Sequence, residues 1–505
     1  MRTAISLLPV TVEVAGRRLG ESELSCLSGI RIQERLSLPS LCELTFLNQA
    51  GGDEMASLSV AGVSLRVTVA NAAQPLFEGE VTAVEFEFET DRASRLRIRG
   101  YDRLHRLRKR QTSRGWSQIG LTHLARDLVS DLGLSVRDAG SDVVWQRIIQ
   151  HGQTDFELLA ERAERCGLYF VLYGGELRFT SLAGFGEPVT LTLGESLLEA
   201  RVEINGDASC RSVSAEGWDP LGVSSFSGGA GTARTGREIA AEVQPGVVGG
   251  RQERKLPGRA LQSVRQAEAL AQAELDARVA REVTFRGLTQ GNPALRPGGV
   301  ICAGGLSQAL NGRYILTEVT HTLEGGRGFF SEISTAPAPP GRRPGGASMT
   351  LGVVTRADDP DHLGRVRASL PGYGGVETDW MQVAASGAGA NKGLVTIPDT
   401  GDNVLVLCAD EDPCQGVVVG GLYGAHGPPI DTRDNHPRCF SLVTAGGQRV
   451  QLDADGKSIR FENGHGSYVE LGPEKSLFHS SVPLHIQAPG QTVAIRGKAI
   501  DFEEA

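Results

Sequence analysis

Apolar and polar residues alternate in short runs over roughly the first 110 residues of the chain. A period of two places the apolar side chains on one face of an extended backbone, so these runs predict β-strands. The clearest runs are residues 11–14, 42–46, 64–69, 76–84 and 95–101. Asp102 and His105 follow them, and we expect both to have a capping or packing role because no second histidine and no plausible nucleophile lies nearby.

Three later segments have a helical period. Residues 117–132 carry an apolar stripe, with Ser117 as the expected N-cap and Gly133 as the stop signal. Residues 154–166 begin with a capping box of Thr154 and Glu157 and end before Gly167. Residues 264–280 form the third predicted helix. The charged residues expected on the solvated face of the second helix are Glu157, Glu161, Arg162, Glu164 and Arg165.

Further strands and a linker complete the first two thirds of the chain. Residues 170–215, 282–287 and 312–321 again predict strands. Residues 224–237 are rich in serine and glycine but lack the Lys-Ser/Thr ending of a phosphate-binding loop, so we predict a flexible insertion. Residues 1–335 are therefore predicted to form a hub of two small β-barrels with packing helices, and residues 336–349 a Pro- and Gly-rich linker.

Glycine and proline turns divide residues 364–424 into short apolar runs. The predicted strands are residues 365–368, 381–384, 393–397, 403–408 and 416–420. The last two are almost continuously apolar, which is typical of strands in a small closed barrel. This spacing predicts an oligonucleotide/oligosaccharide-binding (OB) barrel over residues 350–425, followed by a connector at 426–439.

The last segment, residues 440–505, repeats pairs of apolar residues about every seven to ten positions, or about fifteen where Leu477 interrupts the rhythm. One such ribbon has no second layer against which to bury its apolar face, and its edges are open. Three copies around a common axis would cover both the apolar face and the open edges, so we predict a homotrimer with an intertwined C-terminal β-prism. The alternative is a single β-meander on the barrel. The predicted axis residues are Val450, Leu452, Ile459, Phe461, Val469, Leu471, Leu484, Ile486, Val493, Ile495, Ile500 and Phe502.

Composition supports a mainly β protein with some α. The chain has 505 residues, enough for three or four domains, and its 65 glycines favour turn-dense β structure. A net charge of −9 does not favour a nucleic-acid or anionic-membrane partner. The eight cysteines form no CxxC pair, so we expect neither a zinc ribbon nor a redox motif, and no cofactor. His479 and His485 could ring a three-fold axis, but neither belongs to an HxH pair, and we expect no metal.

Several motifs in order resemble VgrG-type spike proteins of type VI secretion systems, contractile phage tails and extracellular contractile injection particles. They are GRVRASLPG at 364–372, the Trp380-Met381 strand, IPDTGDNVLV at 397–406, and Pro413 followed by GGLYG at 420–424. In the first part of the chain, FEGEVT at 77–82 and YDRLH at 101–105 resemble the hub of the same family.

The resemblance implies a structural protein at the centre of a baseplate and no catalytic residue. Its hub would contact the inner tube and baseplate proteins, and its needle would meet a target membrane only on contraction. A PAAR-type tip protein or effector would dock at the C-terminal end, on Ile500, Asp501, Phe502, Glu503, Glu504 and Ala505. The lysozyme domain that some phage relatives carry between barrel and prism is expected to be absent, because only a short segment lies there. A fused C-terminal toxin is also expected to be absent.

The N-terminal apolar run is too short for a secretion signal, and no stretch reaches membrane-spanning length. We therefore predict synthesis in the cytoplasm without a signal peptide and a final location at the baseplate of a contractile particle. Whether that particle is released from the cell stays open.

Two other functions compete with a mechanical one. An OB barrel can bind nucleic acid or glycan, but residues 350–425 contain four basic and ten acidic residues, the opposite of a phosphate-binding groove. A peptidoglycan-acting enzyme needs two carboxylates facing each other across a cleft, whereas Asp410, Glu411 and Asp412 lie on one short loop.

Overall fold

The structure is a computed structural model of one chain. It describes residues 10–48, 60–70, 72–88, 94–207, 209–219, 221–256, 261–325, 327–338, 346–409, 411–424, 427 and 439–502. The chain divides into two compact units, residues 1–421 and 422–505, and each is described here by itself. Both units are built mainly from strands, which confirms the predicted fold class.

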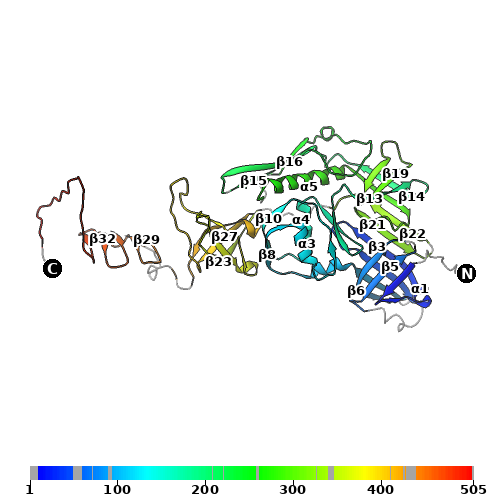
Figure 1. Ribbon diagram of the computed structural model, residues 1–505, viewed down its shortest axis with the longest axis horizontal. Coiled ribbons are helices and arrows are strands. Elements are labelled where there is room, and N and C mark those ends of the chain that lie inside the picture. Colours follow the sequence, from blue (N-terminus) through cyan, green and yellow to red (C-terminus); the bar gives the residue numbers. More distant parts are fainter. Residues whose placement is uncertain are drawn as a thin grey trace. The chain divides into compact units, whose positions relative to one another are not determined.

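Within the described part of the hub, eleven strands pair into one continuous antiparallel sheet (Figure 1). Inward-facing residues of β1 and β3–β7 fill one apolar core, and those of β14, β18, β21 and β22 fill another. The two halves of the predicted hub therefore share one sheet. In sheet order the strands are β14 Leu197–Ile204, β18 Val283–Gln290, β22 Gly328–Ser334, β21 Glu318–Glu324, β3 Leu27–Arg35, β4 Leu41–Asn48, β7 Ser94–Tyr101, β6 Phe77–Glu87, β5 Ser64–Val69, β1 Val10–Val14 and β2 Arg17–Arg18.

Smaller elements lie outside this sheet. The predicted strand at 312–321 is wrong as a single element, because the chain leaves one sheet after Ile315 and enters another at Glu318. These elements are α1 Glu21–Cys26, β9 Ser135–Val136, β11 Tyr169–Tyr173, β12 Glu176–Thr180, β13 Phe185–Thr192, β19 Gly299–Gly304 and β20 Gly312–Ile315, with the 3-10 helices η1 Arg103–Lys109, η2 Pro245–Val248, η3 Pro371–Tyr373 and η4 Pro413–Gln415.

Two helices, α3 (Leu121–Val129) and α4 (Asp155–Arg165), pack around a third apolar core. The prediction of a helix from Ser117 is wrong: residues up to Gly120 belong to β8 (Arg114–Gly120), which pairs with β10 (Val144–Gln150). Tertiary pairing there overrides the local helical pattern. The α4 capping box and the Gly167 stop, with φ of +68°, are confirmed.

The solvated face predicted for α4 has one error. Arg162 is only 5% exposed, and its guanidinium lies over the Trp145 ring, 5.7 Å from the centroid. A sequence pattern cannot distinguish an exposed arginine from one that stacks on a neighbouring aromatic ring.

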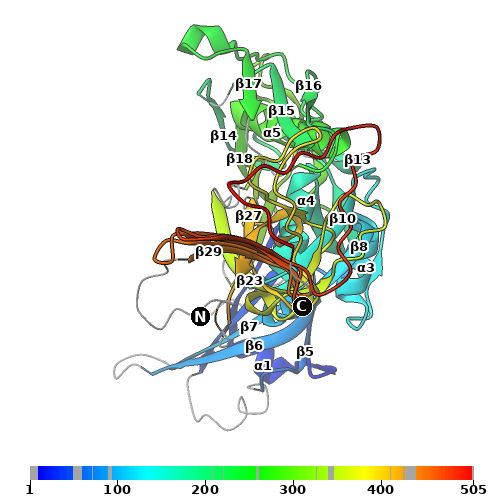
Figure 2. The same ribbon diagram turned by 90° about the vertical axis from the view of Figure 1, so that its left-hand side faces the viewer.

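The Ser- and Gly-rich segment predicted as a flexible insertion is instead β16 (Ser224–Ala230). It pairs with β15 (Ser212–Asp219), which also pairs with β17 (Glu253–Leu256), and α5 (Val264–Glu282) packs against this sheet (Figures 1 and 2). Glycine is needed at 228, since a Cβ there would lie 2.3 Å from the backbone nitrogen of Glu268 in α5. The small residues thus allow close helix packing.

The barrel consists of six strands among the described residues, in the order β25, β24, β23, β27, β28, β26. Its core is formed mainly by valine and leucine side chains, with Met381 and Cys408. Residues 393–397, predicted as a strand, form an exposed loop. β23 begins at Ala347, within the predicted linker. The strands are β23 Ala347–Arg356, β24 Arg367–Leu370, β25 Val376–Glu377, β26 Gln382–Val383, β27 Asn403–Ala409 and β28 Gly416–Leu422.

In the second unit, five strands form an antiparallel meander within the described residues 439–502. We call it the spike sheet. Each strand pairs with the next in the chain, and residues 480–502 contain no strand. The strands are β29 Cys439–Val443, β30 Arg449–Asp453, β31 Ser458–Glu462, β32 Tyr468–Leu471 and β33 Ser476–His479.

The capping box of α4 gives a first testable prediction. Thr154 Oγ1 accepts a hydrogen bond from Glu157 N at 3.2 Å, so Thr154→Ala removes it and costs about 1 kcal/mol of local stability. Amides in the first turn of α4 should then exchange hydrogen about fivefold faster, while Thr154→Ser should change little. Equal exchange in the alanine and serine variants would contradict the role of this cap.

Candidate assembly surfaces and the hub pocket

The spike sheet places most of its apolar side chains on one face, and only Val443 and Leu477 of its larger apolar residues lie on the other. Strand register aligns Leu442, Val450, Phe461, Val469 and Phe478 across all five strands. A second row contains Phe440, Leu452, Ile459 and Leu471. These two rows, which we call the apolar face, contain the predicted axis residues of strands β30–β32.

The opposite face is polar. A row of Ser441, Gln451, Arg460 and Glu470 crosses four strands. Arg460 pairs with both Glu462 and Glu470 at 3.2 Å and lies over the Tyr468 ring, 4.0 Å from its centroid. These contacts are suited to a surface in water.

Most side chains of the apolar face are exposed in the part of the chain that the structure describes. Phe440 is 73% exposed, Phe478 57% and Leu442 54%. Burying a side chain of this size contributes about 1.5–3 kcal/mol, so leaving two such rows in water is costly for a single copy.

Three members of the apolar face were missed from the sequence. Phe440 and Leu442 fall at the start of the predicted prism but were not predicted as axis residues, although they form the same alternating pair as Val450 and Leu452. Phe478 aligns with Val469, and it restores the rhythm that Leu477 seemed to break, since Leu477 lies on the other face.

The remaining predicted axis residues lie beyond the sheet. Leu484, Ile486, Val493, Ile495, Ile500 and Phe502 are all exposed, from 49% at Ile500 to 91% at Phe502. Of the predicted tip-docking residues, Ile500, Asp501 and Phe502 are described, and Glu503, Glu504 and Ala505 lie outside the described residues. His479 aligns with Tyr468 on the polar face, so it would not line an axis formed by the apolar face.

A buried ion pair organises the turn that enters β24. Asp359 accepts hydrogen bonds from the Arg365 guanidinium at 2.7 and 3.0 Å, and from the backbone nitrogens of Asp361, Leu363 and Arg365. Both side chains are less than 10% exposed. The Arg365 hydrogen bonds hold the pKa of Asp359 well below its usual range. Arg365 belongs to the GRVRASLPG motif, and its role is to fix this turn.

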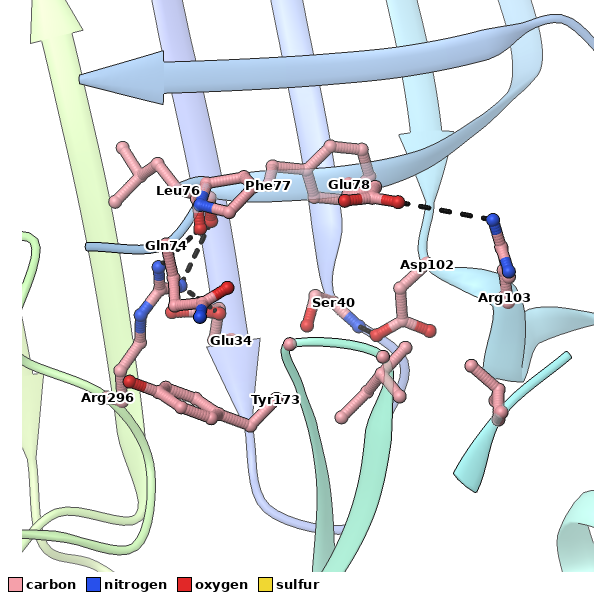
Figure 3. Close-up of a pocket in the computed structure, with 15 residues that line it drawn as sticks. Glu34, Ser40, Gln74, Leu76, Phe77, Glu78, Asp102, Arg103, Tyr173 and Arg296 are labelled. Carbon is pink, nitrogen blue, oxygen red and sulfur yellow. Dashed lines mark hydrogen bonds and ion pairs between the residues drawn. The ribbon is translucent and has the colours of Figure 1, made fainter. Parts of the chain in front are cut away.

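The hub contains a small pocket of about 80 Å³ with two buried carboxyl groups, Glu34 and Asp102 (Figure 3). Asp102 accepts hydrogen bonds from Ser40 N at 2.7 Å and Leu104 N at 2.9 Å, and it caps η1. Burial raises the pKa of Asp102 to about 6. The capping role predicted for this residue is therefore confirmed.

Glu34 also has structural partners. Its carboxylate pairs with Arg296, which donates further hydrogen bonds to the carbonyls of Leu76 at 3.0 Å and Pro75 at 2.8 Å. Burial raises the pKa of Glu34, while the Arg296 charge opposes this. Burial also lowers the pKa of neighbouring His321 to about 3, so its imidazole is neutral, accepting from Ser331 Oγ and donating to Leu295 O.

His105 lies outside this pocket. It packs under the hub sheet, where Nε2 contacts the Glu80 carboxylate, which Arg106 also binds at 2.9 Å. Its role is packing, as predicted. The polar groups in and around the pocket therefore hold strands and turns together.

The hub and barrel contact each other within the first unit. Arg147 donates to the Glu377 carbonyl at 2.7 Å, and the His151 ring meets the Tyr373 ring edge-on, with centroids 4.7 Å apart. A Cβ at Gly374 would lie 2.3 Å from Ser113 Cβ. These contacts fix the barrel on the hub.

Three further properties concern only the described residues. No group of three or more His, Cys, Asp or Glu side chains there could hold a metal ion. None of the helices is both long and apolar enough to cross a membrane. All eight cysteines are described and are free thiols.

Comparison with known proteins identifies the class. Residues 350–423 match the family model of the type VI secretion system/phage-baseplate injector OB domain, and residues 54–325 match that of the Alg8 N-terminal domain. No curated protein matches the sequence.

Solved structures share the fold at low identity. The E. coli c3393 protein, a type VI secretion component with structural similarity to T4 bacteriophage tail proteins gp27 and gp5, is 13% identical with a TM-score of 0.54, covering 82% of this chain and 99% of its own. The Francisella PdpA-VgrG complex gives 8% identity and a TM-score of 0.55, covering 94% and 81%. The 43 kDa tail protein of prophage MuSo2 from Shewanella oneidensis is 15% identical with a TM-score of 0.50, and the match covers 64% of this chain and 97% of that protein.

The chain has the fold of VgrG-type spike proteins, which confirms the resemblance drawn from its motifs. Within this class, it belongs to the family defined by the Alg8 N-terminal domain.

The Asp359–Arg365 pair predicts a pH dependence. Because the folded-state pKa of Asp359 lies below its unfolded value, the pair stabilises the barrel fully above the unfolded pKa, near 4, and progressively less as pH falls through and below it. Asp359→Asn should therefore lower the melting temperature of the barrel at pH 7, and the gap to the unsubstituted protein should narrow at pH 3.

A neighbouring carboxylate provides the control for this calorimetric comparison. Asp358 pairs with Arg356 at 2.8 Å, but both side chains are at least half exposed. Asp358→Asn should hardly change the melting temperature at either pH. If the difference in melting temperature between Asp359→Asn and the unsubstituted protein is the same at pH 7 and pH 3, the charge of Asp359 does not stabilise the barrel.

Proposed function

We propose that three copies of this chain form the central spike of a contractile injection machine. The hub would join the end of the inner tube to the baseplate, and the three spike sheets would form a rigid needle that crosses a target envelope when the sheath contracts. The observation that carries the proposal is the apolar face, two in-register rows of large side chains exposed across the spike sheet.

A trimer solves the burial problem of this sheet. Three apolar faces turned inward around one axis form a core that a single layer cannot form by itself. The polar face, with its Arg460 ion pairs, then faces water. Residues 480–502 carry six exposed apolar axis candidates without any strand of their own, which supports pairing with neighbouring copies.

The proposed task is mechanical. A force applied along the proposed needle would be shared among the many backbone hydrogen bonds that join the strands of the three spike sheets. We also propose that the spike has no catalytic activity and needs no cofactor, because the buried carboxyl groups of the hub pocket are engaged by Arg296, Ser40 and Leu104.

Partners follow from the class. Baseplate and inner-tube proteins would bind the hub, and a PAAR-type tip protein or effector would bind residues 500–505. The Francisella neighbour is a complex of VgrG with PdpA, which supports the idea that this chain also carries a second protein. The location proposed is the baseplate of a phage-tail-like particle made in the cytoplasm, with the target membrane met only on contraction.

A matched pair of substitutions tests the trimer. Val450 and Gln451 are neighbours on β30 and lie on opposite faces of the spike sheet. Val450→Glu would bring three carboxylates together at the axis, at a cost of several kcal/mol, whereas Gln451→Glu adds the same charge on the polar face. Light scattering should give three times 53.6 kDa for the unsubstituted chain and for Gln451→Glu, and a lower mass for Val450→Glu.

The same measurement can reject the proposal. A mass of one chain for the unsubstituted protein at micromolar concentration would show that the apolar face is not a trimer contact. A full trimer in Val450→Glu would show that this row does not face the axis.

The tip site requires a separate experiment. A chain ending at Lys498 lacks Ile500 and Phe502, which are exposed and lie beyond the spike sheet. We expect it to remain trimeric and to lose binding of a PAAR-type protein in a pull-down. Phe502→Ala should weaken that binding, and Lys498→Gln in the full-length chain, just before the proposed site, should not. Unchanged capture by the shortened chain would place the tip protein elsewhere.

A further inference from the structure

The barrel has apolar residues on its outer surface in addition to its core. The first group, which we call the strand patch, lies on three neighbouring strands. Met349 and Leu351 of β23 are 67% and 57% exposed, Leu407 of β27 is 38% exposed, and Val419 of β28 is 46% exposed. Met349 pairs with Leu407 across the β23–β27 ladder, so their side chains share one face. The alternate residues Val404, Val406 and Cys408 point into the core.

A second group, the loop patch, lies on the loop between β26 and β27. Leu394, Val395 and Ile397 are 45%, 80% and 43% exposed, and Leu363 on a nearby turn is 58% exposed. Ile397 reaches this turn, because a Cβ on Gly364 would lie 3.0 Å from Ile397 Cδ1. The loop is folded back by a hydrogen bond from Leu394 N to Ser386 O at 2.9 Å.

Symmetry relates these two patches. In a ring of three copies every contact is heterologous, so each copy must present two different surfaces, one to each neighbour. A patch that met its own counterpart would close a dimer instead. The barrel has two distinct apolar surfaces, which is the number that a three-fold ring requires.

Charged residues beside the two patches support a contact between the loop patch of one copy and the strand patch of another. Lys392 is exposed beside the loop patch, and it is the only basic residue in the sequence between Arg367 and Tyr423. Exposed Glu411 follows β27, at the end of the strand patch where Ala347 pairs with Ala409. Neither side chain has an ion pair within the described residues.

We infer that the loop patch of each copy docks on the strand patch of the next copy, with Lys392 facing Glu411 across the contact. The inference rests on the proposed trimer and adds the residues through which the barrels meet. Each barrel thereby contacts both of its neighbours, so the three copies are joined through their barrels as well as through their spike sheets.

A photo-crosslinking amino acid at position 395 in the full-length chain tests this contact. Irradiation should give a band of two or three chains in a denaturing gel. Peptide mass spectrometry should place the crosslink on residues 347–356 or 403–409. Val247, which is 83% exposed on η2 of the hub, provides a control position of equal exposure, and from there no crosslink to these strands is expected.

Charge reversal provides a second readout. Lys392→Glu should lower the crosslink yield about threefold, the size of effect expected for an exposed ion pair, and adding Glu411→Lys in the same chain should restore it.

The outcomes separate this inference from the function on which it rests. A three-chain mass in solution with crosslinks only inside one chain, or to other segments, overturns the barrel contact and leaves the trimeric spike intact. A one-chain mass overturns both. A crosslink to the strand patch whose yield is unchanged by Lys392→Glu overturns the proposed pairing with Glu411.

Discussion

The structure of this protein depends on the cost of exposing one side of a single-layer sheet. Two rows of apolar side chains cross the spike sheet in register, and the described residues 439–502 form no second layer of strands over them. Strand-forming residues and tight turns are sufficient to form the meander, but burial of its apolar face requires a second layer. The hub differs, because its sheet encloses two cores of its own. The same chain therefore contains a unit with its own cores and a unit whose apolar face is largely exposed, which is the basis of the proposed trimer.

Polar chemistry in the first unit serves to hold elements together. Arg296 joins Glu34 to two carbonyls before β6, Asp102 joins the start of η1 to Ser40, and Asp359 with Arg365 fixes the turn before β24. Removing one partner of such a pair leaves a buried charge uncompensated, which costs more than an exposed pair contributes. The proposed transmission of force from a tube to a needle would need this kind of rigidity, and the Arg147 and His151 contacts extend it to the barrel.

Much of the fold could be predicted from the sequence, and the failures have a common cause. The capping box of α4, the Gly167 stop and the barrel strands at 403–408 and 416–420 follow from local rules, and these predictions are confirmed. Residues 117–120 and 224–230 were misassigned because their conformation is set by a strand partner distant in sequence, β10 in one case and β15 in the other. Arg162 was misplaced for the same reason, since its partner Trp145 lies outside the helix.

The apolar face and the two barrel patches, which we propose as assembly surfaces, show more clearly that a local sequence pattern does not reveal contacts between distant segments. Periodicity alone identified Val450, Leu452, Ile459 and Phe461, because alternation on a strand predicts its faces without knowledge of the partner. It missed Phe478, whose row is visible only once β33 is aligned with β32. It also missed Met349 and Val395, because single apolar residues at a strand start or in a glycine-rich loop carry no period. Where a surface is made by bringing separate segments together, only the three-dimensional register can reveal it, and symmetry then limits what the surface can bind.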